Sequence, residues 1–160
     1  MNDKLTLPAF DPEEIQVRIG TQYPASLAAP CAERRKRVLG DAVGLSHLGV
    51  NMVELPPGSQ SSLRHWHSAE DEFVFILDGV ATLVTDEGAQ QLGPGMAAGF
   101  PAGEANGHHL INNGEQVVRY IEVGDRAAGV DRVEYSDVDL RIVRGPGGRT
   151  VTRSDGSTVD

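Results

Sequence analysis

The sequence has little of several features that define common protein classes. A single cysteine, Cys31, excludes a disulfide within the chain and any cysteine-rich zinc module, and it favours a reducing, cytoplasmic location. No apolar run approaches the roughly 18 residues of a membrane span, and the N-terminal residues lack the pattern of a signal peptide. Basic residues are also few: 14 Lys and Arg against 23 Asp and Glu give a net charge of −9. We therefore expect neither nucleic acid nor a membrane as partner.

Glycine and proline, by contrast, are abundant, with 19 Gly and 9 Pro in 160 residues. This excess indicates many turns, and therefore many short strands rather than a few long helices. The length suits one domain with one hydrophobic core. The sequence thus predicts a single acidic, all-β domain.

Short apolar segments alternate with turn residues between Leu48 and Val123. The apolar run 73–77 predicts a buried strand, and the turn residues 78–79 and 112–114 are typical of hairpins. We expect four aromatic residues to lie mostly in the core: Phe73, Phe75, Phe100 and Tyr120. Strands this short, with turns this frequent, indicate a sandwich or barrel.

The chain divides into three parts on this basis. Residues 45–125 form the barrel core, residues 1–44 an N-terminal arm, and residues 126–160 peripheral strands followed by an extended C-terminal tail that starts at Gly145. The arm holds the one basic run, residues 34–37. This basic run could form an anion site. We prefer the other interpretation, a solvated surface or an interface whose cations pair with acids of the barrel core or of a second subunit.

Histidine is concentrated in two places. His65 and His67 alternate along a predicted strand, so both side chains project from the same face, and Glu72 follows five residues later. His108 and His109 begin a later strand, which barrel closure could bring beside the first. A His-x-His pair alone is often only exposed, but the carboxylate and the second cluster favour a metal site.

Imidazoles with one carboxylate form a nitrogen and oxygen ligand set without thiolate. Such a set suits one divalent ion of iron, manganese, nickel, cobalt or zinc, and it leaves coordination positions for a substrate. We expect a small molecule as that substrate or ligand.

Two stretches of the sequence resemble the paired motifs of the cupin superfamily. The first motif is matched by Gly58, His65, His67, Glu72 and Gly79. The second is matched by Gly95, Pro101, Gly103, His108 and Asn112, with a longer gap before the histidine than is usual. Further short strings resemble a group of small single-domain cupins that are often labelled sugar-phosphate isomerase-like.

The resemblance implies a double-stranded β-helix, or jelly roll, with a metal held by His65, His67, Glu72 and His108. It also implies a homodimer. The longer gap leaves the fourth ligand open, because His109 and Asn113 satisfy the same spacing as His108 and Asn112. We prefer His108.

Neighbouring residues receive plainer interpretations. Glu70 and Asp71 suit a solvated turn, and strand alternation should turn Arg64 and Trp66 away from the ligands. Tyr120 and Glu122 share one face of the last core strand. Either could act as a general acid or base if that face is inward.

The function expected from this pattern is a metalloenzyme for small molecules that uses its metal as a Lewis acid. Sugar-phosphate isomerisation, lyase, decarboxylase and dioxygenase chemistry all remain open, because fold and ligand set do not choose among them. The alternative is a cupin that binds or senses a small ligand without converting it.

Overall fold

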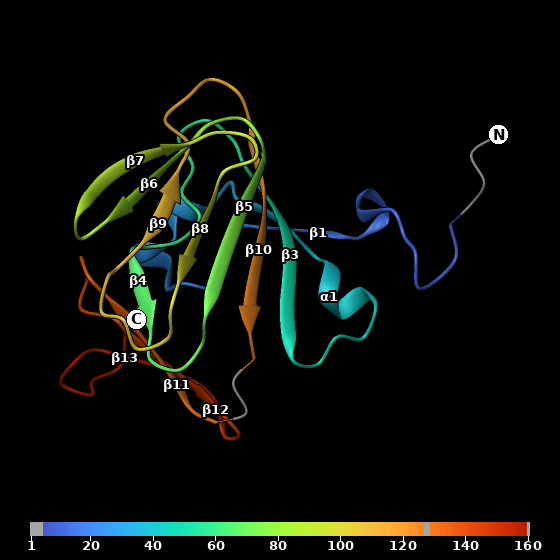
Figure 1. The fold of residues 1–160 in the computed structure, drawn as a ribbon. Coiled ribbons are helices and arrows are strands. Elements are labelled where there is room, and N and C mark those ends of the chain that lie inside the picture. Colours follow the sequence, from blue (N-terminus) through green and yellow to red (C-terminus); the bar gives the residue numbers. More distant parts are fainter. Residues whose placement is uncertain (1–4, 127–128, 160) are drawn as a thin grey trace.

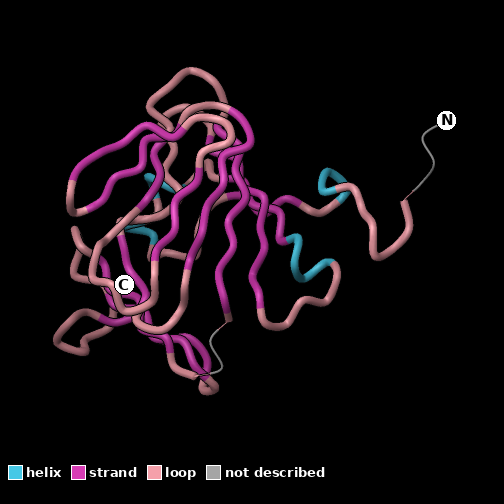
Figure 2. The backbone as a smooth tube through the Cα atoms, in the orientation of Figure 1, coloured by secondary structure: helices cyan, strands magenta, loops and turns pink. Residues whose placement is uncertain are grey.

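The computed structural model describes residues 5–126 and 129–159 (Figure 1). Most of this part of the chain is strand and turn, with only short helical segments (Figure 2). None of the helices in the described ranges has the length and apolarity that crossing a membrane requires. The helical segments are η1 (Pro12–Glu14), η2 (Ala25–Leu27), η3 (Ala29–Cys31) and α1 (Leu39–Ala42). The strands are β1 (Val17–Ile19), β2 (Arg35–Val38), β3 (Leu48–Leu55), β4 (His65–His67), β5 (Glu72–Asp78), β6 (Ala81–Thr85), β7 (Gly88–Leu92), β8 (Ala97–Phe100), β9 (His109–Ile111), β10 (Val118–Asp125), β11 (Asp131–Tyr135), β12 (Arg141–Gly145) and β13 (Gly148–Thr152).

The strands form antiparallel sheets that enclose one main core. One wall is a six-stranded sheet in the order β1-β2-β3-β10-β5-β8. The other wall joins β7-β6-β9 to β4-β11-β12-β13, because isolated bridges connect the segment around β4 to the segment around β9. Figure 1 shows β3, β10 and β5 side by side, with β6, β7 and β9 on the other side of the barrel. From β5 to β10 the chain crosses between the walls at every connection except the β6–β7 hairpin, which gives the double-stranded β-helix expected from the sequence.

This alternation corrects the two predicted hairpins. The turns at residues 78–79 and 112–114 do not join paired strands, because β5 and β6, like β9 and β10, belong to different walls. Gly79 instead lies in the connection that crosses from β5 in one wall to β6 in the other. Its φ is +75°, and a Cβ there would lie 2.7 Å from the carbonyl oxygen of Val117. Local turn chemistry predicts that the chain reverses but not which strand it meets next.

Hydrogen bonds of Asn112 stabilise the connection that crosses from β9 in one wall to β10 in the other. Its side chain is fully buried, and Nδ2 donates to the carbonyl oxygens of Leu55 and Gln116, each at 2.7 Å. Its Oδ1 accepts from the backbone N–H of Gly114 at 3.0 Å. This asparagine therefore stabilises the loop rather than facing a ligand.

The main core lies between the two walls, and β5 contributes alternate residues to it. Val74 and Ile76 are buried, whereas Phe73 and Phe75 are 44% and 37% exposed on the outer face. The prediction that both phenylalanines lie in the core was wrong, because a strand at the barrel wall buries only one of its faces. Tyr120 is fully buried, as expected.

The N-terminal arm is part of the barrel sheet. Strand β2 pairs with β3, and β1 pairs with β2. Two residues of the basic run pair with acids of the body, which confirms our preferred interpretation for them. Lys36 Nζ lies 2.8 Å from Glu122 Oε1, and Arg37 contacts Glu13 at 2.7 Å and Glu54 at 3.4 Å.

The C-terminal segment is also more ordered than the sequence indicated. Strand β11 pairs with β4, and β12 and β13 form a hairpin around Pro146 and Gly147. A second small core of Val133, Leu140 and Ile142 forms beneath it, with Val151 packed against it. The segment from Gly145 is extended and mostly exposed, as expected, and it is held in place because β13 pairs with β12.

Candidate metal centre

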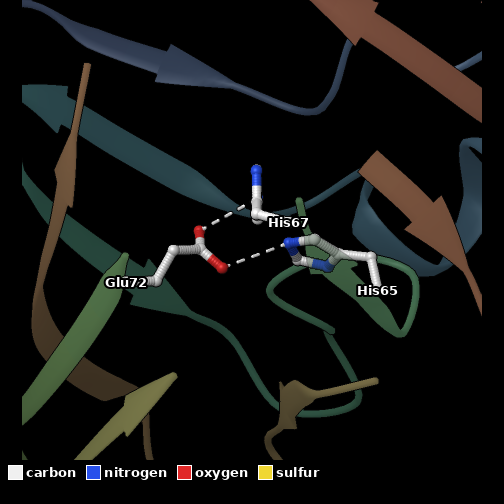
Figure 3. A group of neighbouring side chains, drawn as sticks. All are labelled: His65, His67 and Glu72. Carbon is white, nitrogen blue, oxygen red and sulfur yellow. Dashed lines mark ion pairs between the residues drawn. The ribbon is translucent and has the colours of Figure 1, made fainter. Parts of the chain in front are cut away.

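Three histidines converge on one carboxylate inside the barrel. His65 and His67 leave β4 on the same side, Glu72 stands at the first position of β5, and His108 directly precedes β9. The bridge between His65 and His108 holds the two histidine segments together. Figure 3 shows His65 and His67 pointing toward the Glu72 carboxylate.

The same ring nitrogen of each histidine faces the carboxylate. Nε2 of His65 lies 3.4 Å from Glu72 Oε2, and Nε2 of His67 lies 3.5 Å from Glu72 Oε1. Nε2 of His108 lies closer, at 2.8 Å from Glu72 Oε2. Three nitrogens and two oxygens thus surround one small volume.

The other ring nitrogen of each histidine has its own partner. The Nδ1 contacts are His65 with the Leu63 carbonyl oxygen at 2.9 Å, His67 with Asp131 Oδ2 at 2.7 Å, and His108 with the Asn106 carbonyl oxygen at 3.4 Å. An acceptor at Nδ1 fixes the ring orientation and leaves Nε2 free for a ligand. The Phe100 ring also stacks parallel to His108.

Asp131 is the site residue that the sequence interpretation missed. Its carboxylate is almost fully buried, and Oδ1 accepts from the backbone N–H of Ala69 at 3.0 Å while Oδ2 holds His67. It begins β11, in the segment expected to be peripheral. No nearby motif marks it, because it reaches the site only through the pairing of β11 with β4.

The electrostatics of the cluster favour an ionised carboxylate. Burial alone would raise the pKa of Glu72, but hydrogen bonds from His108, His65 and His67 lower it well below its ordinary value. Burial alone would lower the pKa of His67, but Glu72 and Asp131 together raise it from 6.5 to about 9. The neighbouring carboxylates thus favour the protonated form of His67, and the histidines favour the ionised form of Glu72.

The structure separates the two candidates for the fourth ligand. His108 is buried and contacts Glu72. His109 turns its Nδ1 to the carbonyl oxygen of Ser62 at 3.0 Å, and burial lowers its pKa. Because His109 directly follows His108 in an extended segment, its side chain points to the opposite face.

The donor set fits a divalent metal ion. Ligand atoms of His65, His67 and Glu72 lie within 4.8 Å of one another, and His108 approaches the same carboxylate. The ring orientations described above would present all three Nε2 atoms to one ion. A second group, His67, Glu70 and Asp131, also lies within 4.8 Å, but its contacts run through Nδ1, which Asp131 already holds.

A cavity of about 300 Å³ opens beside the cluster. Trp66 and Glu70 line it together with three of the cluster residues. The Glu70 side chain is largely buried, and its Oε2 lies 3.7 Å from His67 Nδ1, so the expectation that Glu70 is solvated was wrong. The cavity's four acidic lining residues are Glu70, Glu72, Glu87 and Glu104, and Lys and Arg are absent from its described lining. Arg64 does face outward, where it pairs with Asp86 and Asp137.

Tyr120 and Glu122 both face the interior behind the cluster. Glu122 Oε1 accepts hydrogen bonds from Lys36 Nζ at 2.8 Å and from Asn51 Nδ2 at 3.0 Å. Burial would raise the pKa of Glu122, but Lys36 lowers it below its ordinary value. Glu122 is thus engaged in a partly buried ion pair, and it does not line the 300 Å³ cavity.

Comparison with known proteins identifies relatives over nearly the whole chain. Residues 51–124 match the model of the Cupin domain. A crystal structure of a sugar phosphate isomerase of the cupin superfamily from Silicibacter pomeroyi is 42% identical, with a TM-score of 0.91, over 96% of this chain and 97% of that one. No match was found among curated proteins.

Two further structures are more distant. A candidate sugar phosphate isomerase from Acidithiobacillus ferrooxidans is 32% identical, with a TM-score of 0.72, over 81% of both chains. The polyketide cyclase RemF from Streptomyces resistomycificus is 24% identical, with a TM-score of 0.62, over 75% of this chain and 80% of that one, and it shows the shared fold alone. Together with the histidine cluster, these likenesses establish that the chain belongs to the cupin superfamily.

Proposed function

We propose that the protein is a metal-dependent isomerase for small hydroxy-carbonyl compounds of the sugar class. His65, His67, Glu72 and His108 would hold one divalent ion. The observation that carries this proposal is the convergence of three Nε2 atoms on Glu72, each ring being fixed by a separate partner at Nδ1. When bound, the ion supplies Lewis acidity toward two adjacent oxygens of a substrate.

Side chains of the protein would orient the metal ligands and accept the proton that isomerisation moves. Asp131 orients His67, and Phe100 orients His108 by stacking. Isomerisation through an enediol moves a proton between neighbouring carbons, and the cavity supplies carboxylates as acceptors at Glu70, Glu87 and Glu104. Burial and Asp131 raise the pKa of Glu70.

The reaction class receives support from the relative that is 42% identical and is described as a sugar phosphate isomerase. The cavity lining, however, offers carboxylates and no Lys or Arg among its described residues. A phosphate group requires cations, so this cavity favours the unphosphorylated sugar over its phosphate ester.

The first experiment measures metal content in protein purified without a histidine tag. We expect about one equivalent of a divalent metal in the wild type and a loss of nearly all of it in His65→Ala/His67→Ala. His47→Ala is the matched control, because His47 directly precedes β3 and lies outside the cluster. Wild-type protein that binds none of the five candidate metals would overturn the proposal.

The second experiment tests turnover. The metal-loaded protein is incubated in D₂O with a panel of aldoses, ketoses and their phosphate esters, and NMR follows deuterium entry beside the carbonyl. Exchange that depends on Glu72 supports isomerisation. Substrate binding without exchange by any compound supports the alternative, a cupin that binds a small ligand without converting it.

A further inference from the structure

A second cavity lies between the N-terminal strands and the C-terminal hairpin, apart from the histidine cluster. Its volume is about 400 Å³. Its basic lining residues are Arg18, Arg34, Lys36, Arg144 and Arg149, and its described lining includes no Asp or Glu. Five cations and no carboxylate therefore line one cavity in a chain whose net charge is −9.

Four of these five cations have no ion pair. Lys36 pairs with Glu122, but Arg18, Arg34, Arg144 and Arg149 have no carboxylate oxygen within 4.0 Å in the described residues. Other arginines are neutralised by such pairs: Arg37, Arg64, Arg119, Arg126, Arg132 and Arg141. Arg35 and Arg153 also lack an ion pair, so four of the six unpaired arginines of the described residues line this cavity.

Strand pairing places like charges opposite each other on both sides of the cavity. Arg18 is the partner of Lys36 in the β1–β2 ladder, and Arg144 is the partner of Arg149 in the β12–β13 ladder. Like charges directly opposite destabilise a sheet. Lys36 is already paired with Glu122, so the uncompensated repulsion is the one between Arg144 and Arg149, and an anion bound beside them would relieve it.

Arg34 is held beside the cavity by backbone groups. Its Nη1 donates to the Ser61 carbonyl oxygen at 2.6 Å, and its Nη2 donates to the Gly20 carbonyl oxygen at 3.0 Å. Its buried Nε has no hydrogen-bond partner in the described structure. Backbone carbonyl oxygens thus hold the Arg34 guanidinium in place, but no carboxylate of the described residues neutralises its positive charge.

We propose that this cavity is a second binding site, for a small organic anion of the phosphate-ester class with at least two negative charges. Guanidinium groups match phosphate oxygens in geometry as well as charge. The volume suits a metabolite-sized ligand, and Tyr23 and Tyr135 give it an aromatic side. The site stands independently of the proposed metal chemistry, whose cavity has the opposite charge.

The test is a calorimetric titration of EDTA-treated protein with inorganic pyrophosphate at constant ionic strength. We expect one saturable site in the wild type, and a Kd about tenfold weaker in Arg144→Gln and in Arg149→Gln. Arg132→Gln is the matched control, because Arg132 lies on the adjacent strand β11, pairs with Glu134 at 3.0 Å and does not line the cavity. Absence of binding, or equal binding by all four proteins, would overturn the proposal.

A second variant distinguishes this site from the histidine cluster. His67→Ala should bind pyrophosphate as tightly as the wild type does. Loss of binding in that variant would place the anion at the cluster and refute the second site. Thermal unfolding without pyrophosphate gives a further check: Arg149→Gln should be at least as stable as the wild type, because the repulsion from Arg144 is relieved.

Discussion

Asp131 Oδ2 lies 2.7 Å from His67 Nδ1, although 64 positions separate the two residues. The contact joins the C-terminal segment to the candidate metal centre. Because Asp131 is buried and also accepts from the backbone of Ala69, it holds the imidazole in one orientation. The segment after the cupin core thus completes the site.

The first prediction concerns this contact. Asp131→Asn removes the charge that orients His67, so metal affinity should fall by about 10-fold to 100-fold. Asp137→Asn is the control, because Asp137 is exposed and pairs with Arg64 outside the cavity. Competition with a chelator measures both affinities. Equal affinity in the two variants would show that the Asp131 contact is not needed for metal binding.

The second prediction separates the adjacent histidines. His108→Ala removes an Nε2 that faces Glu72, so metal content after dialysis should drop far below one equivalent. His109→Ala removes a ring that contacts the Ser62 carbonyl oxygen, and metal content should stay close to that of the wild type. Elemental analysis of both variants decides the matter. The reverse result would assign the fourth ligand to His109.

The third prediction concerns the crossing at Gly79. Gly79→Ala places a Cβ 2.7 Å from the Val117 carbonyl oxygen at a φ of +75°. The left-handed conformation alone should lower the free energy of unfolding by about 1–2 kcal/mol, and the close contact should add to this. Gly93→Ala, in open space at a turn, is the control and should change stability by less than about 1 kcal/mol. Urea unfolding measures both, and equal stability of the two variants would contradict the assignment.

The fourth prediction uses the ion pair of Lys36 and Glu122. Lys36 lowers the pKa of Glu122 in the folded chain, so the stabilisation is present above the unfolded pKa and is lost as pH falls through the folded pKa. Lys36→Met should therefore destabilise the protein by about 2 kcal/mol near pH 7. The difference from wild type should shrink toward acid pH.

Lys36→Arg is the matched control for this pair, because it keeps the positive charge beside Glu122. Its stability should follow the pH dependence of the wild type in urea unfolding. A Lys36→Met penalty that stays constant from neutral to acid pH would show that the lost alkyl packing, not the charge, is responsible.

Much of the fold and of the candidate site follows from the sequence. The turn residues predict short strands, and the spacing of His65, His67 and Glu72 places two imidazoles on one strand and a carboxylate just before the next apolar run. These are local properties, since side chains two positions apart on a strand share a face whatever the rest of the chain does. The resemblance to the cupin motifs also predicted His108 as the fourth ligand and the jelly roll as the fold.

The tertiary structure alone decided the remaining features. Asp131 reaches His67 because β11 pairs with β4, and the basic residues of β1–β2 and β12–β13 meet because two distant segments close one cavity. Likewise, the turn at Gly79 leads to the opposite wall, and β5 exposes Phe73. Each depends on which strands become neighbours. That choice is set by burial and hydrogen bonding over the whole barrel, which no short stretch of sequence encodes.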